Sequence, residues 1–237
     1  MSPVPPGSPL PAPDDSLVRR SSGEQAALYI RRLIFDGRLR QGDRVPQGDI
    51  ARALGVSRIP VREALLSLER EGWITIRPHR GAFIGSLDEA AVRDHYALYG
   101  LVFGFAARRA TERRTPELAN RLSDLCAALQ REDDPAAVAE LNREFDRLIL
   151  ETASSPRLRA VLRAMVGVVP GNFFALVPGA IEAERAGSRA ILDAVRAGDP
   201  GRAADAYARM LRRQGDLVAL LFRERGLFAA SGPQLPV

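Results

Sequence analysis

The chain has very few of the residues that hold metals, form disulfides or act as thiol nucleophiles. It contains one cysteine, Cys126, and two histidines among 237 residues. A single cysteine cannot close an internal disulfide, and the leucine-rich helical pattern around Cys126 predicts a buried structural thiol. The sequence therefore excludes a disulfide-stapled scaffold and fits a reducing compartment.

Lysine and long apolar runs are also absent. All 34 basic residues are arginine. No uninterrupted apolar run approaches the roughly eighteen or more residues that a membrane-spanning helix needs. The N-terminal residues are Pro-rich and polar, without the charged-then-apolar order of a signal peptide. We expect no membrane association and a cytoplasmic location.

Catalytic signatures are missing from the sequence as well. There is no nucleophile elbow, no phosphate-cradling Gly-rich loop, no zinc-spaced pair of Cys or His, and no dinucleotide-binding fingerprint. Acidic residues are plentiful, but they lie on polar helix faces beside arginines, where solvated pairing is the default. We predict that the protein is not an enzyme and carries no cofactor.

The positive charge is concentrated in one part of the chain. Residues 16–85 carry 13 arginines against 7 acidic residues, a net charge of +6, whereas residues 86–237 carry 21 against 20. A basic surface that is merely soluble would explain the sign of the charge but not its localisation. Attraction to a polyanion, through neutralised phosphates and released counterions, explains both.

The basic segment contains a pattern of two short helices followed by a hairpin. Residues 47–54 are amphipathic, and Gly55 stands where a helix ends in the left-handed region, which glycine tolerates because it has no Cβ. Ser57 is placed to cap the next helix with its hydroxyl, and Gly72 ends that helix. The predicted inward stripe of the second helix consists of Val61, Leu65, Leu66 and Leu68.

The outward edge of the second helix carries arginines. Arg58 and Arg62 are four residues apart near its start, so they share one face. A helix that lies in the major groove of DNA presents its base-reading side chains at this end. Residues 73–76 and 82–84 are β-rich and are joined by a basic turn that contains His79, Arg80 and Gly81. Such a hairpin can reach phosphates or a flanking groove.

The segment SRIPVREALLSLEREGWI and the basic hairpin after it resemble the winged helix-turn-helix of the GntR regulators, over about residues 23–85. Many relatives have an arginine in the first helix of the motif where this chain has Gly48, and a threonine where it has Ile59. These departures bear on the operator sequence more than on DNA binding. The resemblance implies DNA contacts through Ser57, Arg58, Ile59 and Arg62 of the recognition helix and through His79, Arg80 and Gly81 of the wing.

After the hairpin the sequence predicts helices only, six or seven of them. A capping residue followed by proline marks four helix starts, at Thr115-Pro116, Asp134-Pro135, Ser155-Pro156 and Asp199-Pro200. We therefore predict a mainly α protein with a winged helix-turn-helix and a C-terminal helical bundle. The predicted parts are a disordered Pro-rich tail (1–15), the winged domain (16–85), the bundle (86–228) and a flexible tail (229–237).

The predicted bundle resembles the effector-binding domain of the fatty-acid-responsive (FCD) subfamily, most clearly in NREFDRLILETASSPRL and SRAILDAVRAGDPGRAADAYARML. Many members bind a divalent metal with an Asp and a His four apart on one helix and two His on later helices. The matching positions here are Asn142, Asp146, Ser188 and Met210, which supply one carboxylate and no imidazole. We expect no metal, and a site built from Asp146 and water is the alternative.

The first bundle helix departs from the subfamily too, because Tyr99 and Phe103 stand where relatives often have Arg and Glu. Gly100 and Gly104 lie beside them at helical spacing, which lets another element or a ligand approach closely. An apolar effector such as an acyl chain would suit these surroundings, although the aromatic residues can equally be core and dimer interface. The candidate effector pocket comprises Tyr99, Phe103, Asn142, Asp146, Phe173, Ser188, Tyr207 and Met210.

These patterns predict a DNA-binding transcriptional regulator, in the first instance a repressor. Two protomers would bind palindromic half-sites of double-stranded DNA about one helical turn apart. A small effector in the bundle would modulate the affinity for the operator. The alternative is a helical module for small molecules or lipids whose winged domain serves protein association.

Overall fold

The computed structural model describes residues 21–85, 87–165, 169 and 171–228. The chain forms two compact units: one comprises the residues up to Asp88 together with those from Phe222 onward, and the other comprises Glu89–Leu221. The tails predicted at 1–15 and 229–237, and residue 86 at which the predicted bundle begins, lie outside the described residues.

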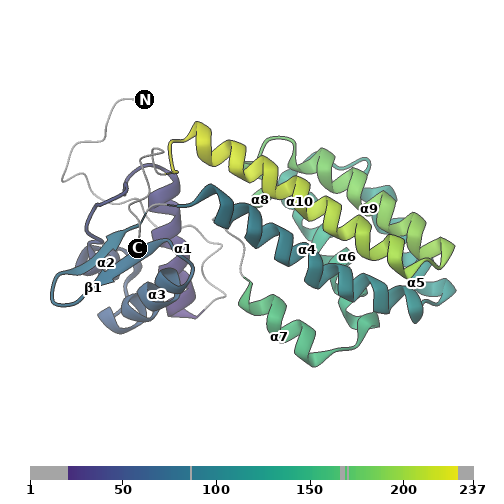
Figure 1. Cartoon of the computed structure of the whole chain (residues 1–237), viewed down its shortest axis with the longest axis horizontal. Coiled ribbons are helices and arrows are strands. Elements are labelled where there is room, and N and C mark those ends of the chain that lie inside the picture. Colours follow the sequence, from purple (N-terminus) through teal and green to yellow (C-terminus); the bar gives the residue numbers. More distant parts are fainter. Residues whose placement is uncertain (1–20, 86, 166–168, 170, 229–237) are drawn as a thin grey trace. The chain divides into compact units, whose positions relative to one another are not determined.

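The first unit contains the winged helix-turn-helix (Figure 1). It begins with a capping box, in which the backbone N–H of Glu24 donates to Ser21 Oγ at 3.3 Å and the backbone N–H of Ser21 donates to Glu24 Oε2 at 3.0 Å. Its elements are α1 (Ser22–Phe35), α2 (Gln47–Leu54), α3 (Arg58–Arg70), β1 (Ile74–Arg77) and β2 (Gly81–Ile84).

The two strands form the hairpin that the sequence predicts. β1 and β2 are antiparallel, with Ile74 opposite Ile84 and Arg77 opposite Gly81. Side chains alternate between the two faces of a strand, so Ile74, Ala82 and Ile84 are buried while Thr75 and Arg77 are exposed. The hairpin is therefore fixed to the core by one face, and its turn projects from it.

A buried arginine fixes α3 against α1. The side chain of Arg31, on α1, is 3% exposed and forms an ion pair with Glu71, the C-cap residue of α3. Ser67 Oγ donates to the other carboxylate oxygen of Glu71 at 3.0 Å. The pair adds little net stability, because Arg31 loses its hydration, while the side chain of Glu71 stays 33% exposed. Removing either partner would leave the charge of the other without its ion pair, so the pair specifies how α1 and α3 pack.

The end of α10 (Pro200–Glu224) belongs to the core of the winged unit. Phe222 is fully buried, and its ring centroid lies 5.8 Å from Phe35 and 6.2 Å from Trp73 in edge-to-face geometry. Arg225 stacks over Phe35 at 3.9 Å and donates to its carbonyl oxygen at 3.2 Å. The sequence assigned residues 86–228 to the bundle, whereas this aromatic packing assigns residues from Phe222 onward to the winged unit.

The second unit is helical throughout the residues described in it. Proline is at the first helical position after all four predicted caps, and the oxygens of Thr115, Asp134, Ser155 and Asp199 each accept a backbone N–H three residues later, at 2.9 to 3.3 Å. The remaining helices are α4 (Glu89–Glu112), α5 (Pro116–Leu129), α6 (Pro135–Ala153), α7 (Pro156–Ala164), α8 (Phe173–Leu176) and α9 (Ala180–Ala197).

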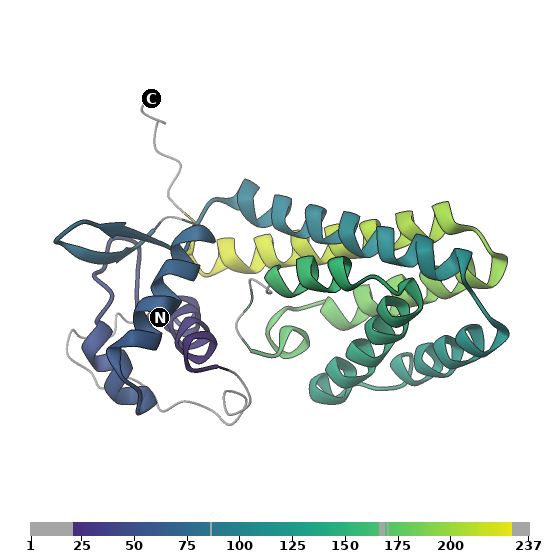
Figure 2. The same cartoon turned by 90° about the horizontal axis from the view of Figure 1, so that it is seen from below.

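Helices α4 and α10 lie side by side in both views of the bundle (Figures 1 and 2), and glycines bring them together. A Cβ added at Gly104 would lie 2.9 Å from the carbonyl oxygen of Ala204, and one at Gly100 would lie 3.1 Å from Cα of Ala208. The sequence predicted a close approach at these two glycines by an element or a ligand, and the element is α10. Among the described residues, no helix has the length and apolar character needed to cross a membrane.

Candidate nucleic-acid interface and effector site

The turn between α2 and α3 sets the direction of the reading helix. Gly55 has φ of 66°, in the left-handed region, as the sequence predicts. Ser57 is the N-cap of α3, but its side chain makes no capping hydrogen bond, so the predicted role of its hydroxyl is wrong. Val61, Leu65 and Leu68 are buried as predicted, whereas Leu66 is 54% exposed. The inward stripe is narrower than predicted, because Leu66 follows Leu65 by about 100° around the helix.

The outward face of α3 begins with exposed and unpaired arginines. Arg58 and Arg62 are both exposed, and neither forms a hydrogen bond or ion pair with another described residue. Ser57 and Ile59 are exposed beside them, Ile59 by 68%. A guanidinium that is not held by a carboxylate is available to bind phosphate or the edge of guanine.

Gly48 leaves room for Arg58. A Cβ added at Gly48 would have only one neighbour within 4 Å, a terminal nitrogen of Arg58 at 3.5 Å. The guanidinium of Arg58 therefore lies next to the helix position where relatives of the winged domain often carry an arginine of their own. This proximity keeps positive charge at the junction of α2 and α3 despite the glycine.

The turn of the wing is strained and basic. His79 has φ of 57° and Gly81 has φ of 105°, and the backbone N–H of Arg80 donates to the carbonyl of Arg77 at 3.0 Å. The side chains of His79 and Arg80 are exposed. Positive φ is uncommon for a residue with a Cβ, so the tight turn fixes where these two side chains project.

Arg44 is a basic residue of the wing that the sequence reasoning missed. It forms an isolated bridge with Phe83 of β2, and its Nε lies 3.0 Å from the place where a Cβ of Gly81 would be. The guanidinium of Arg77 lies 4.9 Å from the ring centroid of Phe83. The sequence of the loop before Pro46 does not predict that Arg44 lies beside the hairpin, because Arg44 reaches it only through the bridge to Phe83.

Four of the predicted effector residues meet in the interior of the bundle. Tyr207 Oη donates to Asp146 Oδ1 at 2.9 Å, which joins α10 to α6. The ring of Phe103 is stacked on Tyr207 with centroids 5.2 Å apart, and Tyr99 meets Phe103 edge-on at 5.0 Å. These four residues form the aromatic–acid cluster: Tyr99, Phe103, Asp146 and Tyr207.

The other predicted effector residues have different surroundings. Asn142 is one turn before Asp146 on α6, and its Oδ1 is buried without a hydrogen-bond partner among the described residues. Ser188 is fully buried and donates to the carbonyl of Arg185 at 3.3 Å. Met210 fills the space at Gly187, and Phe173 packs against Tyr96 and Phe174.

A second buried acid, Glu184 on α9, belongs to the site and was missed by the sequence reasoning. It is 1% exposed, and its Oε2 accepts from Gln214 Nε2 at 3.0 Å, while its Oε1 has no partner among the described residues. Burial, followed by repulsion from Asp146, raises the pKa of Glu184 to about 8. An acid in an amphipathic helix normally faces water, so no local pattern indicates that this one turns inward.

Asp146 and Cys126 are also shifted by burial. Burial raises the pKa of the Asp146 carboxyl to about 7, against the opposing effect of the Tyr207 hydrogen bond. Burial likewise raises the pKa of the Cys126 thiol to about 11, so the thiol is protonated at neutral pH and the prediction of a buried structural thiol is confirmed. The interior of the bundle thus holds two carboxyl groups that are costly to ionise.

The donor set at these positions does not fit the divalent metal of the subfamily. Asp146 shares its Oδ1 with Tyr207, and the side chain of Met210 is packed into the space of Gly187. Within the described residues there is no group of three or more His, Cys, Asp or Glu arranged to hold a metal ion. One carboxylate, an amide, a hydroxyl and a thioether are poor ligands for Zn²⁺ or Mn²⁺.

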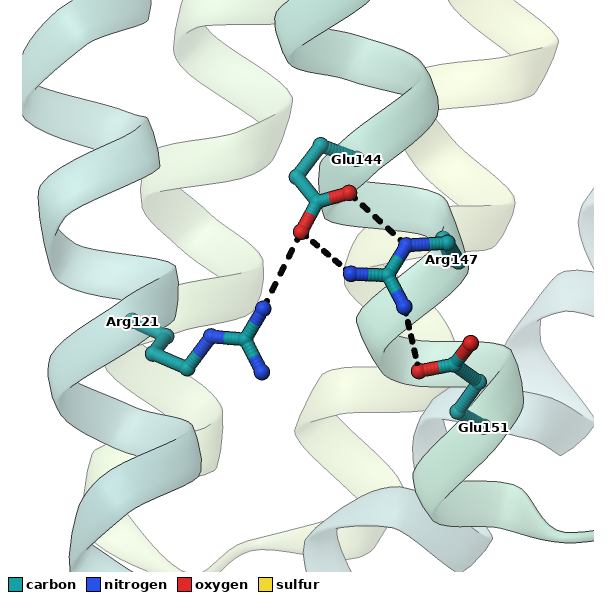
Figure 3. Close-up of polar contacts among 4 residues, drawn as sticks. All are labelled: Arg121, Glu144, Arg147 and Glu151. Carbon is teal, nitrogen blue, oxygen red and sulfur yellow. Dashed lines mark hydrogen bonds and ion pairs between the residues drawn. The ribbon is translucent and has the colours of Figure 1, made fainter.

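A surface groove of about 360 Å³ lies between α5 and α6, and its charges are already paired. Glu144 accepts from Arg147 Nε at 2.7 Å and from Arg121 at 3.1 Å, and Arg147 reaches Glu151 at 2.6 Å (Figure 3). These ion pairs lower the pKa of Glu144. Because these arginines and glutamates pair with one another, none of them is left unpaired to bind a ligand in the groove.

The sequence matches two family profiles. Residues 22–84 match "Bacterial regulatory proteins, gntR family", and residues 94–213 match the "FCD domain". The chain is 38% identical over 151 residues to an uncharacterised HTH-type transcriptional regulator of Mycobacterium tuberculosis, and the match covers 64% of this chain and 62% of that protein. It is 30% identical over 136 residues to the HTH-type transcriptional repressor RspR of Escherichia coli, with 55% and 58% covered.

Solved structures agree with this fold. A GntR family regulator from Pseudomonas syringae pv. tomato superposes with a TM-score of 0.51 at 23% identity, covering 91% of each chain. McbR/YncC of Escherichia coli gives 0.56 at 21% identity, covering 87% of this chain and 99% of its own. From the two profile matches and the order of the winged and helical units, the chain belongs to the GntR family of bacterial regulatory proteins, among the members that carry an FCD domain.

Proposed function

We propose that this protein is a homodimeric, cytoplasmic transcriptional repressor that releases its operator when a small effector binds in the FCD domain. Membership of the GntR family supports the coarse function, a DNA-binding regulator with a C-terminal effector-binding domain. The similarity to RspR, whose name describes a repressor, favours the negative sign of regulation. The regulated genes are those whose control regions contain the operator.

One observation carries the DNA-binding part of the proposal. Arg58 and Arg62 project from the start of α3, exposed and unpaired among the described residues. Ser57 and Ile59 accompany them on the helix, and His79, Arg80 and Gly81 form the tip of the wing. We infer that α3 enters the major groove and that the wing contacts the flanking backbone or minor groove. Arg44 joins the wing in this role.

The dimer part of the proposal rests on α4. Leu98, Leu101 and Phe105 are spaced along one face of this helix and are 56%, 61% and 50% exposed. Large apolar side chains in a row on one face favour burial against a partner. We propose a second copy as that partner, because two reading helices on half-sites one turn apart require a symmetric pair.

The effector would act by preferring one of two states of the dimer. It can weaken operator binding only by as much as its affinities for the DNA-bound and free states differ. The sequence predicts an apolar effector near Tyr99, Phe103, Phe173 and Met210. An apolar effector remains a prediction, and such a ligand would not interact with the carboxyl groups of Asp146 and Glu184.

Selection of bound duplexes from a random DNA library tests the proposal. A palindromic sequence should be enriched, and its affinity should fall steeply with added salt, because phosphate contacts release counterions. A Leu101→Glu variant should shift the protein toward the monomer in light scattering and weaken binding to the full palindrome more than to a half-site. A flat salt response without sequence enrichment would favour the alternative of a helical ligand-binding module.

A further inference from the structure

The aromatic–acid cluster and Glu184 share one region of the bundle interior. Asp146 is close enough to Glu184 to raise its pKa, and Tyr207 is influenced electrostatically by both acids. The two acids come from α6 and α9, while the aromatic rings come from α4 and α10. Four helices therefore contribute to a single polar region inside a helical core.

The two acids have no basic partner in this region. The influences on their pKa values are burial, their mutual repulsion, and hydrogen bonds from Tyr207 and Gln214. Arg185, the neighbour of Glu184 in sequence, is turned to the carbonyls of Leu129 and Glu132 at 2.9 and 2.6 Å. Within the described residues, then, no positive charge compensates these carboxyl groups, and ionising them without compensation is costly.

Unsatisfied acceptors accompany the acids. Oε1 of Glu184 and Oδ1 of Asn142 are buried without a hydrogen-bond partner in the described part of the chain. Buried polar atoms are nearly always paired, so two orphaned oxygens in one region require a donor. Tyr99, Asn142 and Asp146 are only partly buried, so this side of the region is accessible from solvent.

The chemistry of the region selects one class of donor. Oxygen acceptors from Glu184, Asp146 and Asn142 suit an N–H donor that carries positive charge. Phe103 and Tyr207 are buried and stacked on each other, whereas Tyr99 is only partly buried. The face of an aromatic ring carries the negative part of its quadrupole, which attracts organic cations. A divalent metal ion is coordinated by oxygen, nitrogen or sulfur atoms and not by aromatic rings. An acyl chain would leave the carboxyl groups without a charged partner.

We propose that the FCD domain of this protein binds an organic ammonium ion, held by Glu184 and Asp146 and bordered by the aromatic rings of Tyr99, Phe103 and Tyr207. The inference names the effector class and so rests on the proposed function. The cation takes the place of the metal that the donor set does not fit. Glu184 and Asp146 are binding residues, and Gln214 positions Glu184.

Binding should be linked to proton release. At pH 7 the carboxyl group of Glu184, with a pKa of about 8, is largely protonated, and that of Asp146, with a pKa of about 7, is about half protonated. Tyr99 from α4, Cys126 from α5 and Tyr207 from α10 also face them, all with raised pKa values and all neutral at pH 7. A further titratable residue, His95 of α4, is stacked on Tyr99 with ring centroids 6.0 Å apart. An ammonium ion favours the ionised acids, so protons leave the protein as it binds.

The experiment compares three ligands of similar size and shape on the full-length protein: n-butylammonium chloride, butan-1-ol and sodium butyrate. Thermal unfolding should move to higher temperature with butylammonium only, relative to equal sodium chloride. Calorimetric titration at pH 7 in phosphate and in HEPES should give different apparent enthalpies, because released protons are taken up by the buffer. Glu184→Gln should weaken butylammonium binding by about tenfold to a hundredfold.

Glu182→Gln is the matched control, because Glu182 is a more exposed acid on the same helix and should leave binding unchanged. An equal response to butan-1-ol would overturn the proposal in favour of an apolar pocket. A response only to Mn²⁺ or Zn²⁺ would overturn the proposal in favour of a metal site. The absence of any response to butylammonium would also overturn the proposal. DNA binding is measured on the protein without ligand, which separates the two claims. A protein that selects a palindrome but does not respond to butylammonium would retain the regulator function and lose the ammonium site.

Discussion

Replacing Phe222 by alanine should destabilise the winged unit although this residue lies at the end of the last bundle helix. Phe222 is fully buried between Phe35 and Trp73. Truncating a buried phenylalanine to alanine costs about 3–5 kcal/mol. That loss is a large part of the stability of an ordinary domain, about 5–15 kcal/mol.

The chain provides its own probe for this effect, because Trp73 is its single tryptophan and is 2% exposed. Urea unfolding followed by tryptophan emission therefore reports on the unit that contains Phe222. With a urea dependence of about 1 kcal/mol per molar for a small unit, the midpoint should fall by about 3 M or more. Phe222→Leu keeps most of the volume and should cost less than about 1.5 kcal/mol.

Leu220→Ala is the control for this measurement, because Leu220 is two residues earlier on the same helix and 47% exposed. Its effect on the unfolding free energy should stay within about 0.5 kcal/mol. All variants are compared at one protein concentration, since dimerisation adds to apparent stability. If Phe222→Ala moved the tryptophan transition no further than Leu220→Ala does, the assignment of the end of α10 to the winged core would be refuted.

Three further predictions concern backbone packing and proton binding. Gly104→Ala should lower thermal stability by about 1–3 kcal/mol, because its Cβ would press on the backbone of Ala204, and an unchanged melting temperature would contradict the close packing of α4 on α10. The same exchange at Gly48 on α2, where an added Cβ would meet only a terminal nitrogen of Arg58 at 3.5 Å, should instead stabilise by up to about 1 kcal/mol. Unfolding free energy should fall as pH rises from 4.5 to about 8, since folding raises the pKa of Glu184 and the folded state binds more protons in that window. Glu184→Gln should flatten this dependence in part in denaturant titrations across pH, because Asp146, whose pKa is also raised, remains; an equally steep profile would place the titrating group elsewhere.

Local signals in the sequence predicted most of the architecture. Thr115, Asp134, Ser155 and Asp199 cap helices as expected, because a cap and a proline act on the backbone within one turn. Gly55 adopts the left-handed conformation for an equally local reason. Properties that depend on a few neighbouring residues can therefore be predicted from the amino-acid sequence.

The failures involve contacts between distant segments. Glu184 is buried by α10 and α6, which are far from it in sequence, so its acidic character alone suggested a solvated face. Phe222 continues the periodicity of α10 without a break, yet packs with Phe35 and Trp73. Arg44 reaches the wing only through its bridge to β2. The effector site depends on such contacts and was predicted incompletely for that reason.

The most direct test of the central claim, that α3 reads DNA, is the affinity of Arg58→Ala and Arg62→Ala for the duplex that the wild-type protein selects, measured by fluorescence anisotropy at fixed salt. Arg70→Ala is the control, since it removes the same charge about 18 Å along the helix from Arg58 and about 12 Å from Arg62. We predict losses of about 1–3 kcal/mol for each of the first two variants, or about fivefold to more than a hundredfold in Kd, and a clearly smaller loss for the control. Equal affinities for all three variants and the wild type would contradict the account.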